Sequence, residues 1–237
     1  MIGRTVYNFA GIRRSGIHAV MQWMMAGLDA PTAWWNNCNA ERSHYMRRNA
    51  TKAALSDNFD SAKGPDENII FGFEDVPLVK LHNAPLSRHI PRNRTINVLL
   101  LRDPYNMTAS RMERQKRRNA KAKHRYCPNR GLQLWRAYAM ADGWVTMSFN
   151  RLRTEPGHRR QIADLLDMQR VPEWPQSISH YGKGSSFTGM KMDGRASDMP
   201  LDERWKAFAD DPKFLKLTGG DDLDTLSREL CGFGRPW

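Results

Sequence analysis

The chain has 237 residues, which is enough for one well-buried domain and makes a second unlikely. Hydrophobic residues make up 40% of the chain, with eight Trp and nine Phe, a composition that suits a globular protein. The formal net charge of +12 indicates polyanionic ligands: nucleotides, nucleic acid, acidic glycans or an anionic membrane surface.

Three cysteines give neither a disulfide framework nor the spacing of a metal site, and this favours a reducing compartment. The first residues lead directly into a strand pattern, without the charged and apolar leader of a secreted protein. No apolar run approaches the length of a membrane span. We therefore expect a soluble, cytoplasmic protein.

The first predicted elements are a strand, a glycine-bounded loop and a helix. The β-branched and aromatic run 5–9 predicts the strand, and the loop extends from Gly11 to Gly16. Apolar residues then recur at helical spacing from 17 to 28. Such a unit can hold an anion against the backbone N–H groups at the start of the helix.

The spacing Gly11-x-x-x-x-Gly16 is that of a nucleotide-binding P-loop. However, Ile17 and His18 stand where that motif requires Lys and then Ser or Thr. The Lys that grips the outer phosphates and the hydroxyl that holds Mg²⁺ are therefore missing. The loop is predicted to bind an anionic group without a metal, which disfavours an ATPase or GTPase.

Further strands and helices alternate along the chain. Residues 30–65 are polar and weakly periodic, and we interpret them as loop with short helix. Strands are predicted at 68–73, 96–101 and 144–149, and the nearly continuous apolar run at 96–101 is typical of a parallel sheet covered on both faces. Helices are predicted after Pro104, around 132–139 and 162–166, and at 223–230. These elements predict one three-layer α/β/α domain over residues 1–237, with a central parallel sheet, like the P-loop nucleoside-triphosphate hydrolases.

Charge is concentrated in residues 111–125, which hold eight Lys or Arg and one Glu. One interpretation is a solvated helix face or a mobile loop. The other is a surface that attracts an acidic ligand by long-range steering.

Candidate binding residues follow three predicted strands. The loop 13–16 follows the first, Glu74 and Asp75 follow the second, and Arg102 follows the third with Ser110 further along the next helix. Open parallel sheets bind ligands at this edge. The arrangement offers two anion-binding positions with a carboxylate between them.

These segments resemble a known family. Arg13-Arg14-Ser15-Gly16 resembles the 5′-phosphosulfate loop of sulfotransferases that use 3′-phosphoadenosine 5′-phosphosulfate (PAPS). The stretch from Leu100-Leu101-Arg102-Asp103-Pro104 to Ser110-Arg111 resembles their 3′-phosphate motif, and residues 181–187 look like a variant of their C-terminal glycine-containing loop.

The resemblance implies a metal-independent sulfotransferase with PAPS as the donor and 3′-phosphoadenosine 5′-phosphate (PAP) as the product. Arg14 takes the place of the loop Lys and would stabilise charge on the transferred group. The cofactor-binding residues implied are Arg13, Arg14, Ser15, Gly16, Ile17 and His18 at the 5′ end, and Arg102, Ser110, Lys183, Gly184, Ser185 and Ser186 at the 3′-phosphate.

The resemblance also implies a base that accepts the proton of the acceptor hydroxyl. Glu74 sits where the glycan-modifying branch keeps a catalytic Glu, and we expect it to be the base, with His18 as the alternative. The family's usual adenine-stacking aromatic is replaced by Ala19, so Phe149 or a Trp is expected to take that role. The acceptor is predicted to be a glycan or small metabolite hydroxyl, with much of its pocket formed by residues 30–65 and 111–130.

Other classes stay open at this point. The net charge also fits a nucleic-acid-binding protein, although no zinc-finger, RRM or KH pattern supports it and no nucleic-acid partner is expected. A P-loop nucleotide kinase or NTPase variant, and a sulfotransferase fold that only binds, are further alternatives. Oligomeric state does not follow from the sequence.

Overall fold

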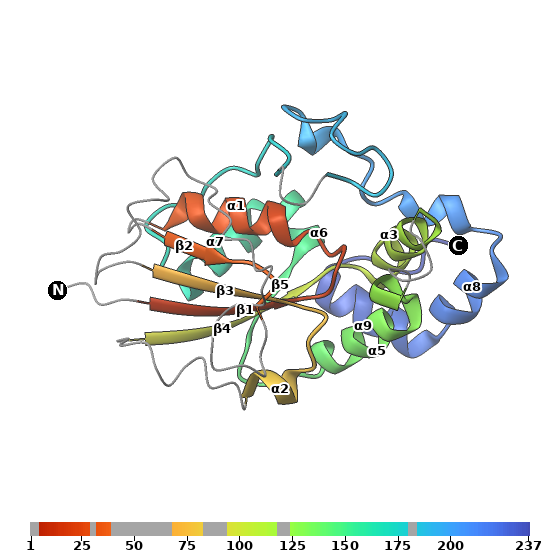
Figure 1. The fold of residues 1–237 in the computed structure, drawn as a ribbon, viewed down its shortest axis with the longest axis horizontal. Helices are drawn as coiled ribbons and strands as arrows, with labels where there is room; N and C mark the ends of the chain where they lie inside the picture. The colour runs from red at the N-terminus through yellow and green to blue at the C-terminus, as the bar shows by residue number, and fades with distance from the viewer. Residues whose placement is uncertain (1–4, 29–31, 39–67, 83–93, 118–123, 180–183) are drawn as a thin grey trace.

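The computed structural model describes residues 5–28, 32–38, 68–82, 94–117, 124–179 and 184–237. Their centre is a five-stranded sheet in the order β2-β3-β1-β4-β5 (Figure 1). Every neighbouring pair of strands is parallel. The strands are β1 (Thr5–Gly11), β2 (Thr32–Trp35), β3 (Asn68–Glu74), β4 (Arg94–Leu101) and β5 (Val145–Ser148).

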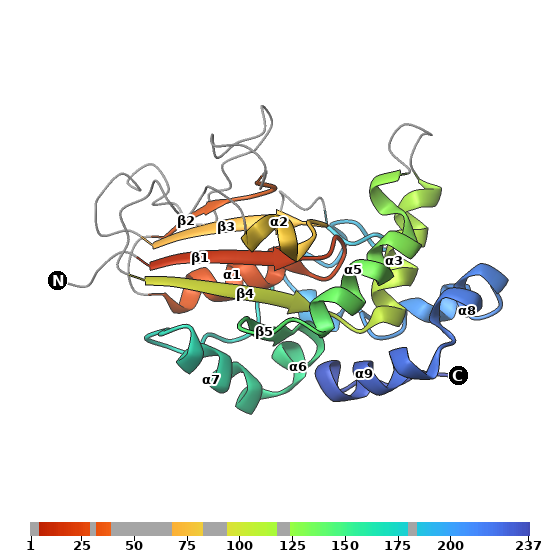
Figure 2. The ribbon, with the colours of Figure 1, turned by 90° about the horizontal axis from the view of Figure 1, so that it is seen from below.

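Helices cover both faces of this sheet, which makes the α/β/α layering visible in Figures 1 and 2. One face carries α1 (Ile17–Gly27), α6 (Phe149–Thr154) and α7 (Pro156–Leu165). The other carries α2 (Leu78–His82), α5 (Pro128–Ala139) and α9 (Asp221–Cys231). Beyond the carboxyl ends of the strands lie α3 (Pro104–Lys116) and α8 (Pro212–Thr218). The chain also forms three short 3-10 turns: η3 (His124–Tyr126), η5 (Ala196–Asp198) and η6 (Arg204–Phe208). The predicted α/β class with a parallel sheet is confirmed.

The core follows from the alternation of side chains along the central strands. On β4, Val98 and Leu100 pack in the cluster on the α1 face, while Leu99 and Leu101 pack in the cluster on the α5 face. All four are fully buried. Both faces of β4 are therefore covered, as its continuous apolar run predicted.

The helix that follows β4 begins where the sequence predicts. The Asp103 side chain accepts a hydrogen bond from the Asn106 backbone N–H, and Pro104 occupies the first turn. An N-terminal cap of this kind stabilises a helix by about 1 kcal/mol. The cap fixes the start of α3 directly after Arg102.

Two predicted segments differ from the structure. Within residues 30–65, Thr32–Trp35 form the edge strand β2. The sequence did not predict this strand, because a run of four residues is too short to show a period. Residues 39–67 lie outside the described part. The predicted strand 144–149 is shorter, because the Ser148 side chain caps α6 and Phe149 already belongs to that helix.

The register of the sheet brings the predicted strand ends together. Gly11 at the end of β1 is paired with Glu74 on β3 and with Leu100 on β4. The chain leaves β1 toward β2 on one side and later crosses to β4 on the other, so the direction of winding reverses beside β1. A reversal of this kind opens a crevice at the carboxyl edge of the sheet.

Within the described ranges, no helix combines the length and hydropathy needed to cross a membrane.

Candidate functional site

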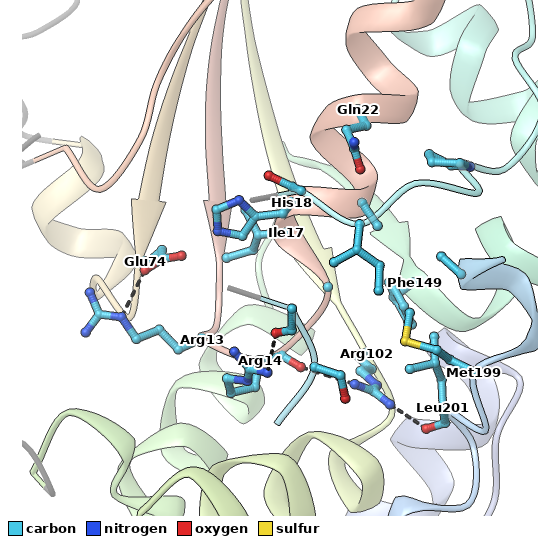
Figure 3. A pocket seen from close by; sticks show the side chains of 18 of the residues that line it. Arg13, Arg14, Ile17, His18, Gln22, Glu74, Arg102, Phe149, Met199 and Leu201 are labelled. Carbon is cyan, nitrogen blue, oxygen red and sulfur yellow. Dashed lines mark hydrogen bonds and ion pairs between the residues drawn. The ribbon is translucent and has the colours of Figure 1, made fainter. Parts of the chain in front are cut away.

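A cavity of about 370 Å³ lies at the carboxyl edge of the sheet (Figure 3). Its walls come from the β1–α1 loop, the first turns of α1, the ends of β3 and β4, and segments between 174 and 204. Of the residues predicted from sequence, those lining it are Arg13, Arg14, Gly16, Ile17, His18, Glu74, Arg102, Phe149, Gly184 and Ser185.

The β1–α1 loop takes a conformation that few side chains tolerate. Arg14 has a φ of 77° and Gly16 a φ of 93°, both in the left-handed region. A Cβ atom on Gly16 would lie 2.1 Å from the Phe149 ring, so the position has no room for a side chain. The Ser15 N–H already donates to the Ile12 carbonyl, so the amide groups left for an anion begin after Ser15.

Asp75 and Arg111 hold the β1–α1 loop in place through hydrogen bonds to the Arg13 backbone. The Asp75 carboxylate accepts a hydrogen bond from the Arg13 backbone N–H at 2.9 Å and another from Arg111 Nη1 at 2.9 Å. Arg111 is fully buried and also donates to the Arg13 carbonyl at 3.3 Å. The interpretation of residues 111–125 as one solvated face or loop is therefore wrong at its first residue, because Arg111 pairs with Asp75 inside the protein.

Glu74, the predicted base, is paired with Arg13 (Figure 3). Arg13 Nε lies 2.9 Å from Glu74 Oε2, and Arg13 Nη2 donates to Asn37 Oδ1 at 2.9 Å. Burial opposes the charge of Arg13, but Glu74 and Asp75 outweigh it and raise the pKa of its guanidinium above the ordinary value. Arg13 therefore fixes the position of the Glu74 carboxylate at the cavity wall.

Arg14 lacks a carboxylate partner within the described residues. Its Nη2 donates to the Gly184 carbonyl at 3.3 Å, while its buried Nε has no hydrogen-bond partner there. Burial and the neighbouring Arg114 lower the pKa of Arg14 to about 10, so it stays protonated at neutral pH. Its charge is available to an anion in the cavity.

His18 lies on α1 above the cavity in Figure 3. Its ring meets that of Trp34 edge to face, with 5.2 Å between centroids, and its buried Nδ1 has no partner among the described residues. Burial lowers the pKa of His18, with Glu74 acting in the opposite direction. The ring is therefore neutral at pH 7 and retains the capacity to accept a proton.

Arg102 joins the β1–α1 loop to the C-terminal segment. Its Nη1 donates to the Arg14 carbonyl at 3.2 Å and its Nη2 to the Leu201 carbonyl (Figure 3). The guanidinium lies 5.1 Å from the centre of the Phe149 ring. Burial lowers the pKa of Arg102 to about 10, although Asp103 opposes the shift.

Ser110 is separated from the cavity by an arginine that the sequence analysis did not identify. The Ser110 hydroxyl donates to the Asn106 carbonyl at 2.7 Å and accepts from Arg204 Nη1 at 2.9 Å. Arg204 Nη2 donates to the Ser185 hydroxyl at 3.0 Å. Arg204 thus connects two predicted phosphate-binding residues and itself lines the cavity.

Arg204 is 8% exposed and has no carboxylate partner in the described ranges. Burial, followed by the charges of Arg102 and Arg14, holds its pKa well below the ordinary value. Isolated buried charges are costly unless they are paired. Three guanidinium groups therefore gather here, and among the described residues only Arg102 has a carboxylate partner, with its Nε 3.8 Å from Asp103 Oδ2. Such an excess of positive charge is expected at an anion-binding site.

Three of the predicted cofactor residues do not line the cavity. Ser15, Ser110 and Ser186 are each at most 1% exposed, and the hydroxyls of Ser15 and Ser186 have no partner within the described part of the chain. Lys183 lies outside the described residues.

The opposite wall of the cavity is largely apolar. Phe149 and Trp174 meet edge to face at 5.5 Å, and Met199 and Leu201 lie nearby in the lining. Two polar atoms there, Gln22 Oε1 and Ser179 Oγ, are buried without a hydrogen-bond partner in the described ranges. A flat ligand with polar edges suits such a wall.

Most of these additional residues carry no signal in the sequence. Arg204 meets Ser110 across 94 positions of the chain, and Gln22 reaches Ser177 across 155. The residue among them that the sequence could have indicated is Trp174, because it stands beside Pro175 and an aromatic residue in a loop is a candidate ligand contact.

The described residues lining the cavity include five arginines and a single carboxylate, Glu74. Since Glu74 is paired with Arg13, the remaining surface is strongly positive. In the described ranges, no cluster of three or more His, Cys, Asp or Glu could hold a metal ion. The arrangement can bind a multiply charged anion and place it beside a carboxylate and a neutral histidine.

No protein-family model matches the chain, and no curated protein is similar to it in sequence. Among solved structures, it is similar to the mouse sulfotransferase SULT7A1, which was crystallised in complex with PAP. The identity is 12% and the TM-score 0.47, and the similarity covers 95% of this chain and 85% of the mouse chain. A match this distant assigns no role to any residue of this chain.

Proposed function

We propose that this chain is a sulfotransferase that moves a sulfuryl group from PAPS to an acceptor hydroxyl, with residues 1–237 forming one sulfotransferase-like domain. The observation that carries the proposal is the cluster of Arg14, Arg102 and Arg204 around a cavity at the carboxyl edge of the sheet, in which the described residues pair only Arg102 with a carboxylate, that of Asp103. A ligand with anionic groups at two separated points would neutralise this cluster.

The described residues fit such a ligand at its 3′-phosphate end. Arg204 and Arg102 supply charge, and both have already lost most of their hydration to burial. Arg204 is held in place by the hydroxyls of Ser110 and Ser185. Guanidinium groups bind phosphate through paired N–H donors, so a preoriented Arg204 suits a terminal phosphate.

The described residues also fit the 5′-phosphate and the adenine ring of such a ligand. The backbone N–H groups of Ile17 and His18 begin α1 and have no acceptor within their own helix. Arg14 lies in the same loop with an unsatisfied Nε. The apolar wall formed by Phe149 and Trp174 would hold the adenine, and the unpartnered Gln22 Oε1 offers an acceptor to its amino group.

When bound, PAPS supplies the sulfuryl group that forms a bond to the acceptor oxygen as its bond to the 5′-phosphate breaks, and PAP is released. Arg14 would stabilise the charge that develops on the phosphate oxygen, because it is protonated and its Nη2 is held by the Gly184 carbonyl. Glu74 would take the proton from the acceptor hydroxyl, and Arg13 holds its carboxylate in position for this. His18, neutral and unpartnered at Nδ1, is the alternative base.

A calorimetric titration tests the proposal. PAP is expected to bind with a micromolar or lower Kd that does not change with Mg²⁺. AMP, which lacks the 3′-phosphate, is expected to bind at least about tenfold more weakly, because it cannot reach Arg204. Binding of ATP only, and only with Mg²⁺, would instead favour a nucleotide kinase or NTPase.

A further inference from the structure

Arg114 is a cavity-lining cation with no part in the cofactor site described above. It lies in the last turn of α3, and its guanidinium is 5.9 Å from the centre of the Tyr126 ring. Its Nε is buried without a hydrogen-bond partner in the described part of the chain. The ion pairs of α3 in the same ranges are Arg111 with Asp75 and Arg117 with Glu113, so Arg114 is left over.

Arg114 lies near Arg14, the residue that follows Arg13 in the β1–α1 loop. Arg114 lowers the pKa of Arg14, and Tyr126 acts on the pKa values of both Arg13 and Arg14. The principal charges acting on the pKa of Arg204 are those of Arg102 and Arg14, and Arg114 is not among its main neighbours. Arg114 therefore lies nearer to Arg14 than to Arg204, which in the proposed complex is the side that faces the acceptor.

The same side carries groups suited to hydroxyls. Asn36 and Asn37 follow β2 and line the cavity, and the buried Asn36 Oδ1 has no partner within the described residues. Asn37 is fixed by Arg13. An acceptor bound here would meet amide groups, the Glu74 carboxylate and one uncompensated cation.

We propose that Arg114, stacked on Tyr126, binds an anionic group of the acceptor. The acceptor is then a hydroxylated molecule, such as a sugar, that carries its own carboxylate or sulfate near the hydroxyl that is modified. This inference rests on the proposed sulfotransferase function.

The physical reason is the balance of charge at this end of the cavity. Arg13 and Glu74 neutralise one another, and Arg14 would face the transferred group, so Arg114 is left without an anion among the described residues. An arginine on an aromatic ring presents its N–H edge outward, which is the geometry for paired hydrogen bonds to a carboxylate or sulfate. A neutral acceptor would leave the buried Nε of this cation without an anionic partner.

The test compares three sugars that share a ring and aglycone. These are p-nitrophenyl β-glucuronide, p-nitrophenyl β-glucoside and p-nitrophenyl β-glucoside 6-sulfate, each assayed for transfer from PAPS. We expect at least one anionic sugar to exceed the neutral glucoside about tenfold or more in kcat/KM, mainly through KM. The ratio between the two anionic sugars shows whether a carboxylate or a sulfate is recognised.

Three variants separate recognition from folding. Arg114→Gln should abolish the preference for the anionic sugar and leave the PAP Kd within about twofold of wild type. Arg114→Lys should keep part of the preference, because it retains the charge without the planar group. Arg117→Gln, at the residue that caps the C-terminus of α3 and outside the cavity lining, is the matched control and should change neither quantity.

Four results would overturn the inference: equal use of charged and neutral sugars, no transfer to either anionic sugar, an unchanged preference in Arg114→Gln, or a weaker PAP Kd in that variant. The last result would assign Arg114 to the cofactor. Failure of wild-type protein to bind PAP in the same series would instead reject the proposed function, so the two failures are distinguishable.

Discussion

Replacement of Arg204 by Met separates a ligand-binding role from a structural one, because the two roles predict opposite changes in stability. Arg204 is buried beside Arg102 and Arg14, and the described residues provide no carboxylate for it. Methionine has a similar volume, a flexible side chain and no charge, so it can fill much of the same space.

The serines that contact Arg204 keep other hydrogen bonds after the replacement. Ser110 still donates to the Asn106 carbonyl, and the Ser185 hydroxyl still accepts from the backbone N–H groups of Phe187 and Thr188 at 3.1 and 3.3 Å. The two lost bonds cost about 1–3 kcal/mol together. Removing a buried charge that has no ion-pair partner among the described residues returns a similar or larger amount, about 1–4 kcal/mol.

The Arg204→Met protein without ligand is therefore expected to gain about 1 kcal/mol in its free energy of unfolding, or about 2–4 °C in Tm. Its affinity for PAP should fall by about 2–3 kcal/mol, roughly 30- to 150-fold, because charge-assisted bonds to the 3′-phosphate are lost. Urea unfolding and calorimetric titration measure the two quantities. A variant destabilised by more than about 2 kcal/mol that still binds PAP normally would refute the reasoning.

Arg159→Met is the matched control for Arg204→Met. Arg159 is also 8% exposed, but it lies outside the cavity and donates to the Leu152 carbonyl at 2.9 Å. Its loss leaves a buried carbonyl without a donor, so this variant should be destabilised by about 1–3 kcal/mol and bind PAP as wild type does.

Three further changes give distinct outcomes. Gly16→Ala should lower the free energy of unfolding in urea by about 2–4 kcal/mol, because the residue has a positive φ and its Cβ would overlap the Phe149 ring. Glu74→Gln should lower the transfer rate about 10²- to 10⁴-fold in single-turnover assays while the PAP Kd stays unchanged, because the amide can still contact Arg13 but cannot accept a proton. Burial holds the pKa of His18 in the folded protein below its ordinary value of about 6.5, so as the pH drops the unfolded chain binds a proton first and the folded state loses stability. His18→Gln removes this titration and should therefore reduce the loss of stability between about pH 7.5 and pH 5.5.

Each of these predictions has a result that contradicts it. Gly143→Ala shares the positive φ but meets nothing within 4 Å, so a loss equal to that of Gly16→Ala would deny a role to the Phe149 contact. An unchanged rate in Glu74→Gln would move the base to His18. Identical pH dependence of urea unfolding in wild type and His18→Gln would show that His18 titrates normally.

Local sequence patterns predicted the strand, the helix cap and the loop that position the site. The apolar run of β4, the cap at Asp103 and the glycine spacing of the β1–α1 loop each act within a few residues, so each can be interpreted from the sequence alone. The parallel sheet then brings Glu74 beside Gly11, which placed the predicted base at the same edge as the loop.

The rest depends on contacts between distant parts of the chain. Ser110 was predicted from its spacing to Arg102, but its hydroxyl is occupied by Arg204, which lies 94 positions away in a segment without a strong motif. The strand β2 has four residues, too few for a period to show. Arg111 was counted with a charged run, and only the fold brings Asp75 to it.

A crystal structure of the complex with PAP tests the central claim most directly. The account predicts the 3′-phosphate within hydrogen-bond distance of Arg204, the 5′-phosphate at the amide groups of Ile17 and His18, and the adenine against Phe149 and Trp174. PAP bound outside this cavity, or bound with its 3′-phosphate away from Arg204, would contradict it.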